Sequence, residues 1–528
     1  MMKDRRILAL VAIFLLLLLT FQFLRSPQKV IHLDIHRSTI KSIREEISSY
    51  HPPPYRIFHL DLKGAPPKIS YLREIFPLVR EAGGNALLVE YEDMFPYTGM
   101  LSNASALNAF TPSQIKEIVS IAEENELKVI PLIQTFGHME HVLKLSEFVA
   151  LREIPSYPQS LCPSKWESFQ LVVMMIDQLL SLHPNVEYLH IGCDEVYHMG
   201  ICSKCSDRIR RSKTSSLFID HLLRISSYIL TKHPHVKPIV WDDMLRNLPE
   251  NELKVLKNAV EPMVWVYVED IYHFVGKSTW RKYSNVFPHI WAASAFKGAY
   301  GERLFLPNIS RHFKNHLSWR RVLQREGSYY MGRKLQFRGI ALTGWSRYDH
   351  FAVLCELLPP SIPSLILNLV LMSFSGPEEV ILKKVQSIIK CNQLETSNLE
   401  PESFEDCSFP GVDILLAMLS FQVIKAKVES LDTDSRYKQG WLTSYNVKYN
   451  FTSPWRISET MRNHISLPNQ VKDFKLNMES NLKKIYEEST VLEWTEQNVS
   501  PLQDKLDNLI RTVRELSYRN TWQRRPFC

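Results

Sequence analysis

Residues 186–195 read VEYLHIGCDE, an apolar run that ends in a glycine, a cysteine and two adjacent carboxylates. A short apolar run bounded by polar residues and turn formers is typical of a buried β-strand. Similar runs alternate with amphipathic stretches from residue 55 to residue 349. The eight strands that we expect cover residues 56–62, 86–92, 128–134, 186–193, 238–241, 263–267, 289–294 and 339–345.

Strands that alternate with helices predict a parallel sheet with helical crossovers, and eight such units in succession predict a (β/α)8 TIM barrel. A doubly wound open sheet is the alternative. Neither G-x-G-x-x-G nor G-x-x-x-x-G-K-[ST] follows the first strand, which favours the barrel. One barrel helix has a clear start, because Thr111 can cap it, Pro112 suits its first turn and Gln114 can close a capping box.

The N-terminus predicts a membrane anchor. Basic residues precede the uncharged run 7–24, which spans roughly 27 Å as a helix and so matches a bilayer. No small-residue cleavage site follows it, so we expect an uncleaved signal anchor with a cytoplasmic tail at 1–6. The remaining predicted regions are a stem at 25–54, the catalytic barrel at 55–350 and a mainly helical C-terminal region at 351–528.

This topology predicts a single-pass type II membrane protein of the secretory pathway, with a lumenal barrel and a Golgi location. A secreted or extracellular protein is the alternative. Possible glycosylation sites, which agree with a lumenal chain, begin at Asn103, Asn308, Asn450 and Asn498. The oligomeric state is not predicted by the sequence.

The composition is that of a globular protein with a large core, because 45% of the 528 residues are hydrophobic and 23% are charged. The net charge of +7 is small for this length, and no nucleic-acid partner is expected. Cys202 and Cys205 form a C-x-x-C, for which a local disulfide is favoured over a structural metal site and a redox pair. No second C-x-x-C completes a zinc ribbon, although Cys162 and Cys193 could approach it in space.

Polar and aromatic residues gather where the expected strands end. In a barrel these ends converge on the face that carries active sites. A single such residue is more often part of a cap or an ion pair, but several together favour a functional site. The residues in question are Asp61, Lys63, Glu90, Glu92, His138, Trp241 and Asp242.

The adjacent pair Asp194 and Glu195 could bind a metal, act as the two carboxylates of a retaining glycosidase, or perform two separate tasks. No H-E-x-x-H or similar ligand spacing accompanies the pair. A nucleophile and an acid on opposite sides of a sugar ring stand roughly 5 Å apart, which neighbours on one strand do not easily reach. Two tasks on one substrate are therefore favoured, with an internal nucleophile provided by the sugar.

The motif at residues 190–196, HIGCDEV, resembles the H-x-G-x-D-E signature of family 20 glycoside hydrolases, the β-N-acetylhexosaminidases. Further segments, in order between residues 55 and 350, are similar to the hexosaminidase D branch of this family. They are HLDLKGAPPKISYL, EYEDMFPY, QTFGHMEHVLK, CDEVYHMG, WDDML, ASAFKGA and GWSRYDH. The resemblance implies exo-acting hydrolysis of terminal N-acetylgalactosamine or N-acetylglucosamine from glycoconjugates, with no cofactor and no catalytic metal.

By this resemblance Glu195 is the general acid and base, and Asp194 orients the 2-acetamido group that attacks the anomeric carbon to form an oxazolinium intermediate. The neighbouring Asp194 carboxylate is expected to raise the pKa of Glu195. Substrate-binding residues implied by the resemblance are His138, Trp241, Trp265, Tyr267, Trp345, Asp61, Glu90 and Asp242. A catalytically weak barrel that binds lumenal carbohydrate is the alternative function, and a glycosyltransferase is a third, without a clear D-x-D to support it.

Overall fold

The computed structural model describes residues 50–327, 329–330, 333–433, 439–462 and 466–527. The predicted cytoplasmic tail at 1–6, the predicted anchor at 7–24 and most of the predicted stem lie outside these residues. Among the described residues, no helix combines the length and the apolar composition needed to cross a bilayer. Pro52–Phe374 and Glu378–Cys528 form one compact unit, which contains the barrel and its site.

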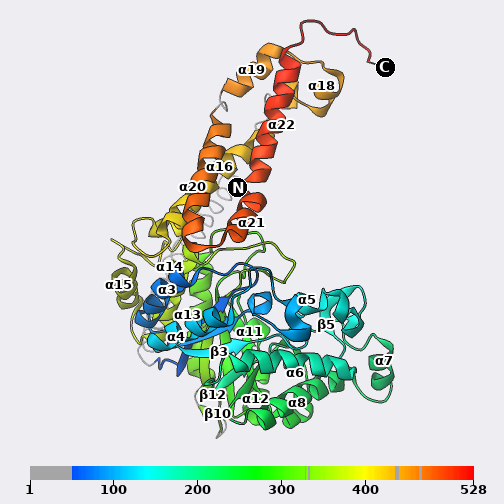
Figure 1. Ribbon diagram of the computed structural model, residues 1–528. Helices are drawn as coiled ribbons and strands as arrows, with labels where there is room; N and C mark the ends of the chain where they lie inside the picture. Colours follow the sequence, from blue (N-terminus) through cyan, green and yellow to red (C-terminus); the bar gives the residue numbers. More distant parts are fainter. Residues whose placement is uncertain (1–49, 328, 331–332, 434–438, 463–465, 528) are drawn as a thin grey trace, which may run out of the picture. The chain divides into compact units, whose positions relative to one another are not determined.

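Eight parallel strands close into a barrel, as the sequence predicts (Figure 1). The first strand pairs with both the second and the last strand of the barrel, so the sheet has no open edge and the alternative of a doubly wound sheet is wrong. The strands are β1 (Tyr55–Asp61), β2 (Ala86–Glu90), β3 (Lys128–Leu132), β6 (Tyr188–His190), β7 (Lys237–Trp241), β8 (Glu261–Trp265), β9 (His289–Lys297) and β12 (Gln336–Gly344).

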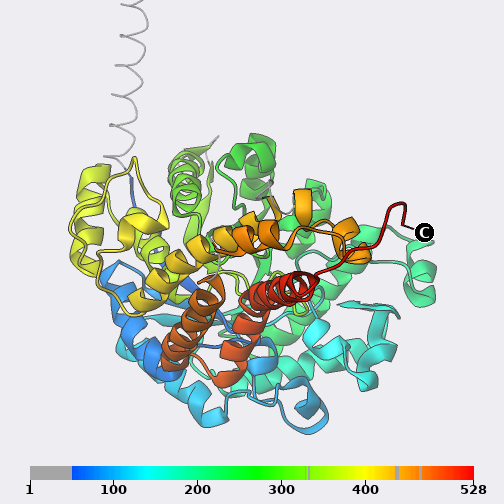
Figure 2. The same cartoon turned by 90° about the horizontal axis from the view of Figure 1, so that it is seen from above.

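Helices surround the barrel in chain order, and in Figure 2 the colours run around this ring from blue through cyan and green to yellow. The helices between the strands are α3 (Ile69–Glu81), α4 (Pro112–Glu124), α6 (Trp166–Ser181), α8 (Thr214–Lys232), α9 (Asp243–Arg246), α10 (Glu250–Leu253), α11 (Ile271–Phe274), α12 (Lys277–Val286) and α13 (Ile309–Glu326). Helix α4 begins with the capping box that was predicted, because the Thr111 side chain accepts from the Gln114 amide and Gln114 reaches back to the cap.

Short elements interrupt the regular alternation at three places. After β3 the chain forms α5 (Glu140–Leu143) and the hairpin of β4 (Arg152–Ile154) and β5 (Tyr157–Leu161). After β6 it forms α7 (Ser203–Ile209). A second hairpin, β10 (Tyr329–Tyr330) and β11 (Arg333–Lys334), precedes β12.

Apolar side chains from alternate positions of the strands fill the interior of the barrel, so the barrel is a packed core. The buried cluster there includes Ile57, Leu88, Ile130, Ile239, Met263 and Trp291. Trp265 and Trp345 are partly buried and pack against this cluster. These two tryptophans of the candidate site are therefore supported from inside the barrel by close-packed apolar side chains.

The eighth helix of the barrel is α14 (Ile362–Ser373), which contacts α3, α13 and three barrel strands. It lies beyond residue 350, the predicted C-terminal boundary of the barrel. Apart from its last residue, every position of α14 is buried. A helix that is apolar on all sides shows no amphipathic pattern, which is why the sequence did not reveal its role.

The remaining helices form the helical C-terminal region that was predicted. They are α15 (Glu378–Ile389), α16 (Val412–Thr433), α18 (Ser444–Tyr449), α19 (Pro454–Arg462), α20 (Leu467–Ile485), α21 (Glu488–Asn498) and α22 (Ser500–Ser517). Helices α16, α20 and α22 pack side by side (Figure 1). Leu502, Leu506 and Leu516 of α22 are buried, and α22 contacts α16, α19, α20 and α21.

The C-terminal region holds the loop between β12 and α14. The guanidinium of Arg347 in this loop forms an ion pair with the Glu493 carboxylate of α21 at 2.5 Å. The side chain of Gln497, also in α21, accepts from the Leu354 amide and donates to its carbonyl. Trp345 lies in the same loop, so α21 supports one wall of the candidate site.

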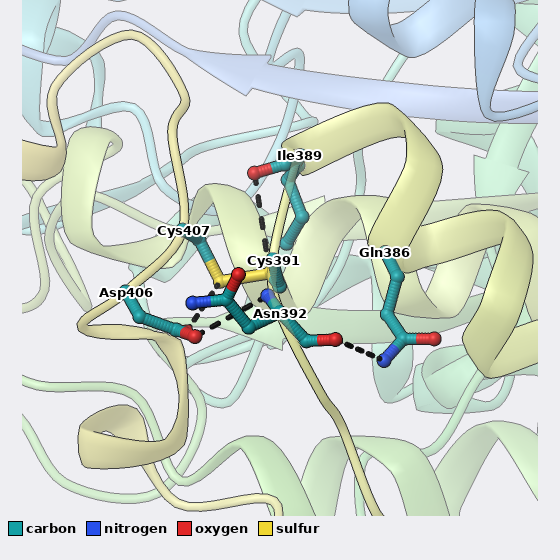
Figure 3. Close-up of a disulfide and its surroundings, with 6 residues drawn as sticks. All are labelled: Gln386, Ile389, Cys391, Asn392, Asp406 and Cys407. Carbon is teal, nitrogen blue, oxygen red and sulfur yellow. Dashed lines mark hydrogen bonds between the residues drawn. A yellow bond between two sulfur atoms is a disulfide. The ribbon is translucent and has the colours of Figure 1, made fainter.

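A disulfide joins Cys391 to Cys407 beyond α15 (Figure 3). The Asp406 carboxylate beside it accepts from the Asn392 amide, so both sides of the closed segment are held. Closing a segment of this length stabilises the fold by about 3 kcal/mol. Disulfides are typical of oxidising compartments. This agrees with the lumenal placement, which stays a prediction.

Candidate active site

A cavity of about 170 Å³ opens at the carboxyl ends of the barrel strands. It brings together seven of the residues that the sequence singled out for the site: His138, Asp194, Glu195, Trp241, Trp265, Tyr267 and Trp345. Its other lining residues are Lys63, Gln134, Gly298, Ala299 and Tyr348. The carboxyl ends of the strands are where this fold carries its chemistry.

A larger cavity of about 620 Å³ lies at the amino ends of β1, β3 and β6. Its charged residues include Lys128 and Glu187, which form an ion pair at 2.9 Å and are each 57% exposed. An exposed pair of this kind is a solvated surface contact. The larger cavity is therefore not the candidate active site, which is the smaller cavity at the carboxyl ends of the strands.

The loop after β6 leaves the strand geometry early and turns the carboxylates into the cavity. Gly192 and Glu195 both have positive φ, at 64° and 50°. A Cβ on Gly192 would lie 1.9 Å from the Gln134 side-chain oxygen, and one on Gly137 would lie 2.1 Å from the Asp194 carbonyl. The positive φ of Gly192 and the backbone carbonyl beside Gly137 therefore favour glycine at these two positions.

His138 joins the two carboxylates. Its Nε2 lies 3.1 Å from Glu195 Oε2 and 3.7 Å from Asp194 Oδ2, while its Nδ1 lies 4.0 Å from Glu140 Oε1. Burial opposes the charged imidazolium, but Asp194, the hydrogen bond with Glu195 and Glu140 outweigh it and raise the His138 pKa to about 10. His138 is therefore protonated at neutral pH and donates to Glu195.

The two carboxylates differ in environment, and one expectation about them is wrong. The hydrogen bond from His138 lowers the Glu195 pKa, although burial opposes this, and the Tyr197 hydroxyl adds a second hydrogen bond at 2.8 Å. Burial instead raises the pKa of Asp194, against the charge of His138. The expected rise for Glu195 does not occur because a cation lies against this carboxylate, and it outweighs the influence of the neighbouring acid.

Asp243 is a site residue that the sequence analysis missed. Its Oδ2 accepts from the Glu195 amide at 2.9 Å, and its Oδ1 accepts from Trp265 Nε1 at 3.1 Å. Burial raises its pKa to about 7, with Asp194 as the next cause. The motif WDDML carries two adjacent aspartates after β7, and the pattern alone does not tell which one binds the backbone amide of Glu195.

The other aspartate of this motif, Asp242, has a structural environment. Arg246 binds both of its oxygens at 2.8 Å, and the Trp265 amide and the Tyr283 hydroxyl also donate to it. It is fully buried and does not line the cavity. Its predicted contact with substrate stays a prediction, and its observed contact with the Trp265 amide holds the backbone at the end of β8.

The cavity is walled by five aromatic side chains, Trp241, Trp265, Tyr267, Trp345 and Tyr348. The rings of Trp265 and Tyr267 have centroids 5.2 Å apart, and those of Trp241 and Trp345 are 6.1 Å apart. Trp345 Nε1 donates to the Tyr267 hydroxyl at 3.1 Å. Among the described residues the buried Trp241 Nε1 has no partner, so it is available to a bound molecule.

Asp61 and Glu90 are buried and do not line the cavity. Both face the Lys63 ammonium, at 3.7 Å and 3.5 Å, and Glu92 faces it at 3.3 Å. Lys63 is 4% exposed, lines the cavity and lies 5.2 Å from the centre of the Trp345 ring. The sequence marked Lys63 at a strand end without assigning it to the site.

The cysteines of the C-x-x-C do not form the favoured disulfide. Cys202 and Cys205 are both free thiols, and the Cys202 sulfur instead accepts from the Cys205 amide at the start of α7. Cys162 is close to both, as anticipated, whereas Cys193 lies elsewhere and contacts Thr135.

Comparisons with known proteins agree with this arrangement. The family model described as the glycosyl hydrolase family 20 catalytic domain matches residues 84–284, which contain Asp194, Glu195 and Asp243. Hexosaminidase D of Homo sapiens is 42% identical over 468 residues, covering 88% of this chain and 95% of the relative. Hexosaminidase D of Bos taurus is 46% identical over 346 residues, covering 64% of this chain and 98% of the relative. The chain therefore belongs to glycosyl hydrolase family 20, and it is a β-hexosaminidase similar to hexosaminidase D.

Proposed function

We propose that the protein removes terminal N-acetylgalactosamine or N-acetylglucosamine from glycoconjugates by a retaining, substrate-assisted reaction. One observation carries the proposal: Asp194 and Glu195 reach one small cavity side by side, 3.7 Å and 3.1 Å from the same histidine nitrogen. Two carboxylates held on the same side of a cavity do not straddle a sugar ring as a nucleophile and an acid must.

The division of labour is proposed from the exposure of the two carboxylates. The charge of His138 favours the ionised form of Glu195, so the reactive form is the fraction in which Glu195 carries its proton and Asp194 is ionised. Glu195 is the more exposed, with 33% of its side chain accessible, so it can reach a glycosidic oxygen at the mouth of the cavity. It protonates this oxygen as the bond to the leaving group breaks and later removes a proton from the attacking water.

Asp194 is deeper, with 13% of its side chain accessible, and its Oδ1 has no hydrogen-bond partner among the described residues. In the proposed reaction this oxygen accepts from the acetamido N–H. The hydrogen bond directs the acetamido carbonyl oxygen at the anomeric carbon and stabilises the positive charge of the oxazolinium intermediate. No covalent bond to the enzyme forms.

The aromatic walls suit an N-acetylhexosamine. Trp241, Trp265 and Trp345 provide apolar faces for the sugar ring and the acetamido methyl group. Tyr267 and the free Nε1 of Trp241 provide hydrogen-bond donors in the cavity that Asp194 also lines. A sugar without the acetamido group would leave Asp194 with no partner in a buried site, which is costly.

A substrate panel tests the proposal. Purified protein is expected to cleave an aryl N-acetyl-β-galactosaminide, an aryl N-acetyl-β-glucosaminide or both, and to leave the matching β-galactoside and β-glucoside uncleaved. Product is expected to appear first as the β-anomer when hydrolysis is followed by NMR. Sugar binding without turnover, at acidic and neutral pH, would instead favour the carbohydrate-binding alternative.

The pH profile of a His138→Gln variant tests the electrostatic part of the site. The charge of His138 lowers the pKa of Glu195 and opposes the rise of the Asp194 pKa. Without this charge both pKa values move up. Activity requires protonated Glu195 and ionised Asp194, so both limbs of the kcat/KM profile are expected to shift to higher pH. His235→Gln, at an exposed histidine, is the matched control. An unmoved profile would show that His138 does not set these ionisations.

A further inference from the structure

We propose that Glu153, Cys162, Cys202 and Cys205 bind a structural zinc ion beside the active-site loop. The four side chains each turn one ligand atom toward a common point, and these atoms all lie within 4.8 Å of one another. Glu153 lies in β4, Cys162 follows β5, and the C-x-x-C opens α7, so three separate segments on one side of the barrel meet there (Figure 1).

The spacing of the sulfurs suits a tetrahedral ion. Cys162 Sγ is 3.3 Å from Cys202 Sγ and 3.5 Å from Cys205 Sγ. Zinc–sulfur bonds of about 2.3 Å place the sulfurs of a tetrahedral site about 3.8 Å apart, so an ion requires only a small outward movement of the thiols. A disulfide would join two of the three sulfurs and leave the third without a partner. An iron–sulfur cluster takes four cysteines.

Glu153 gives an independent indication of a cation. Its side chain is buried, with 1% of the residue exposed. One carboxylate oxygen, Oε1, accepts from the amides of Ile201 and Cys202 at 2.6 Å and 2.9 Å. The other oxygen, Oε2, is buried without a hydrogen-bond partner among the described residues. A buried carboxylate oxygen without a partner is costly, and a bound cation removes this cost.

The surroundings also favour thiolates. Ser164 Oγ lies 3.0 Å from Cys205 Sγ, and Arg208 donates to the same hydroxyl oxygen at 3.1 Å. Because Arg208 occupies the oxygen as an acceptor, the hydroxyl proton of Ser164 is free to be donated to the sulfur. Such hydrogen bonds to ligand atoms are a regular part of metal sites. On binding, each thiol releases its proton to solvent, and zinc undergoes no redox change.

The position of the ion would constrain the catalytic loop. The loop leaves the barrel at Gly192, carries Glu195 and Tyr197, and ends at Cys202. An ion at its far end ties it to the β4–β5 hairpin, and so helps to hold the Tyr197 hydroxyl on Glu195. The ion would lie outside the cavity, since none of its ligands lines it.

Metal analysis of the full chain tests the proposal. Protein purified without chelators is expected to contain about one zinc ion per chain by mass spectrometry, and Cys162→Ser and Cys205→Ser are expected to lose it. Cys355→Ser is the matched control and is expected to keep the ion. Cys355 is also a buried free thiol, but its sulfur contacts the Trp345 carbonyl and not the cluster. Wild-type protein with no bound metal, or with a disulfide among the three cysteines in peptide mapping, would overturn the proposal.

Two further measurements separate a metal site from a packing role. Glu153→Gln keeps the shape of the side chain but removes its charge, and it is expected to release zinc to a competing chelator at least tenfold more readily than wild type. Cobalt in place of zinc is expected to give thiolate-to-metal absorption that Cys205→Ser lacks. Removal of the ion is expected to speed amide exchange in residues 196–209 but not in α4. Equal zinc retention by wild type and Glu153→Gln would remove Glu153 from the ligand set.

Discussion

Glu195→Gln is expected to lower kcat by 10²–10⁴-fold, the usual contribution of a general acid and base, while substrate binding changes little. Glutamine retains the size of the side chain and can still contact His138 and Tyr197, so the loop keeps its shape. It lacks the proton that the glycosidic oxygen must receive. The loss is therefore expected in the chemical step and not in the fold.

The leaving group makes this prediction specific. A natural disaccharide needs a proton on its leaving oxygen, whereas a nitrophenolate leaves with little help. The Glu195→Gln variant is therefore expected to retain more of its activity on the nitrophenyl substrate than on the disaccharide. Glu123→Gln, at an exposed position of α4, is the control for the substitution itself. Equal losses on both substrates would count against proton transfer by Glu195.

Asp194→Asn is expected to lower kcat/KM by about 10²–10³-fold, in the range found for the loss of one preorganised electrostatic partner of a transition state. Asparagine presents an amide where the acetamido N–H needs an acceptor, and it carries no charge to stabilise the oxazolinium ion. A better leaving group does not replace either function. The loss is therefore expected to be similar on nitrophenyl and disaccharide substrates.

Binding of a stable thiazoline analogue of the oxazolinium ion completes this test. Calorimetry is expected to show a large loss of affinity for Asp194→Asn and a smaller one for Glu195→Gln, because only Asp194 contacts the acetamido-derived ring in the proposed mechanism. Asp413→Asn, with its carboxylate 63% exposed in α16, is the control. If Asp194→Asn bound the analogue as tightly as wild type, the acetamido group would not be held by Asp194.

The barrel could be predicted from the sequence because its strands are buried on both faces and read as apolar runs. All eight expected strands are present, and seven of the predicted site residues line one cavity at their carboxyl ends. The start of α4 could also be predicted, since a capping box acts through residues three positions apart. The strands and the helix start could be predicted because each depends on residues that are close together in the sequence.

The missed features depend on contacts between distant segments or on the direction of one side chain. The predicted strand at 186–193 shortens to Tyr188–His190 because the backbone turns at Gly192, which has a positive φ and leaves room for the side chain of Gln134 from the loop after β3. The choice between Asp242 and Asp243 depends on which of the two side chains reaches the backbone amide of Glu195. The lowered pKa of Glu195 depends on His138, which is 57 residues away in the chain.

The link from Arg347 to Glu493 limits how short an active form of this enzyme can be. A truncation at residue 350 keeps every barrel strand but removes α14, which closes the outer ring, and α21, which fixes the loop that carries Trp345. Expression of the barrel alone would therefore expose an apolar seam and release one wall of the sugar pocket. A shortened enzyme intended for crystallisation or inhibitor screening should extend at least through Asn498, the end of α21.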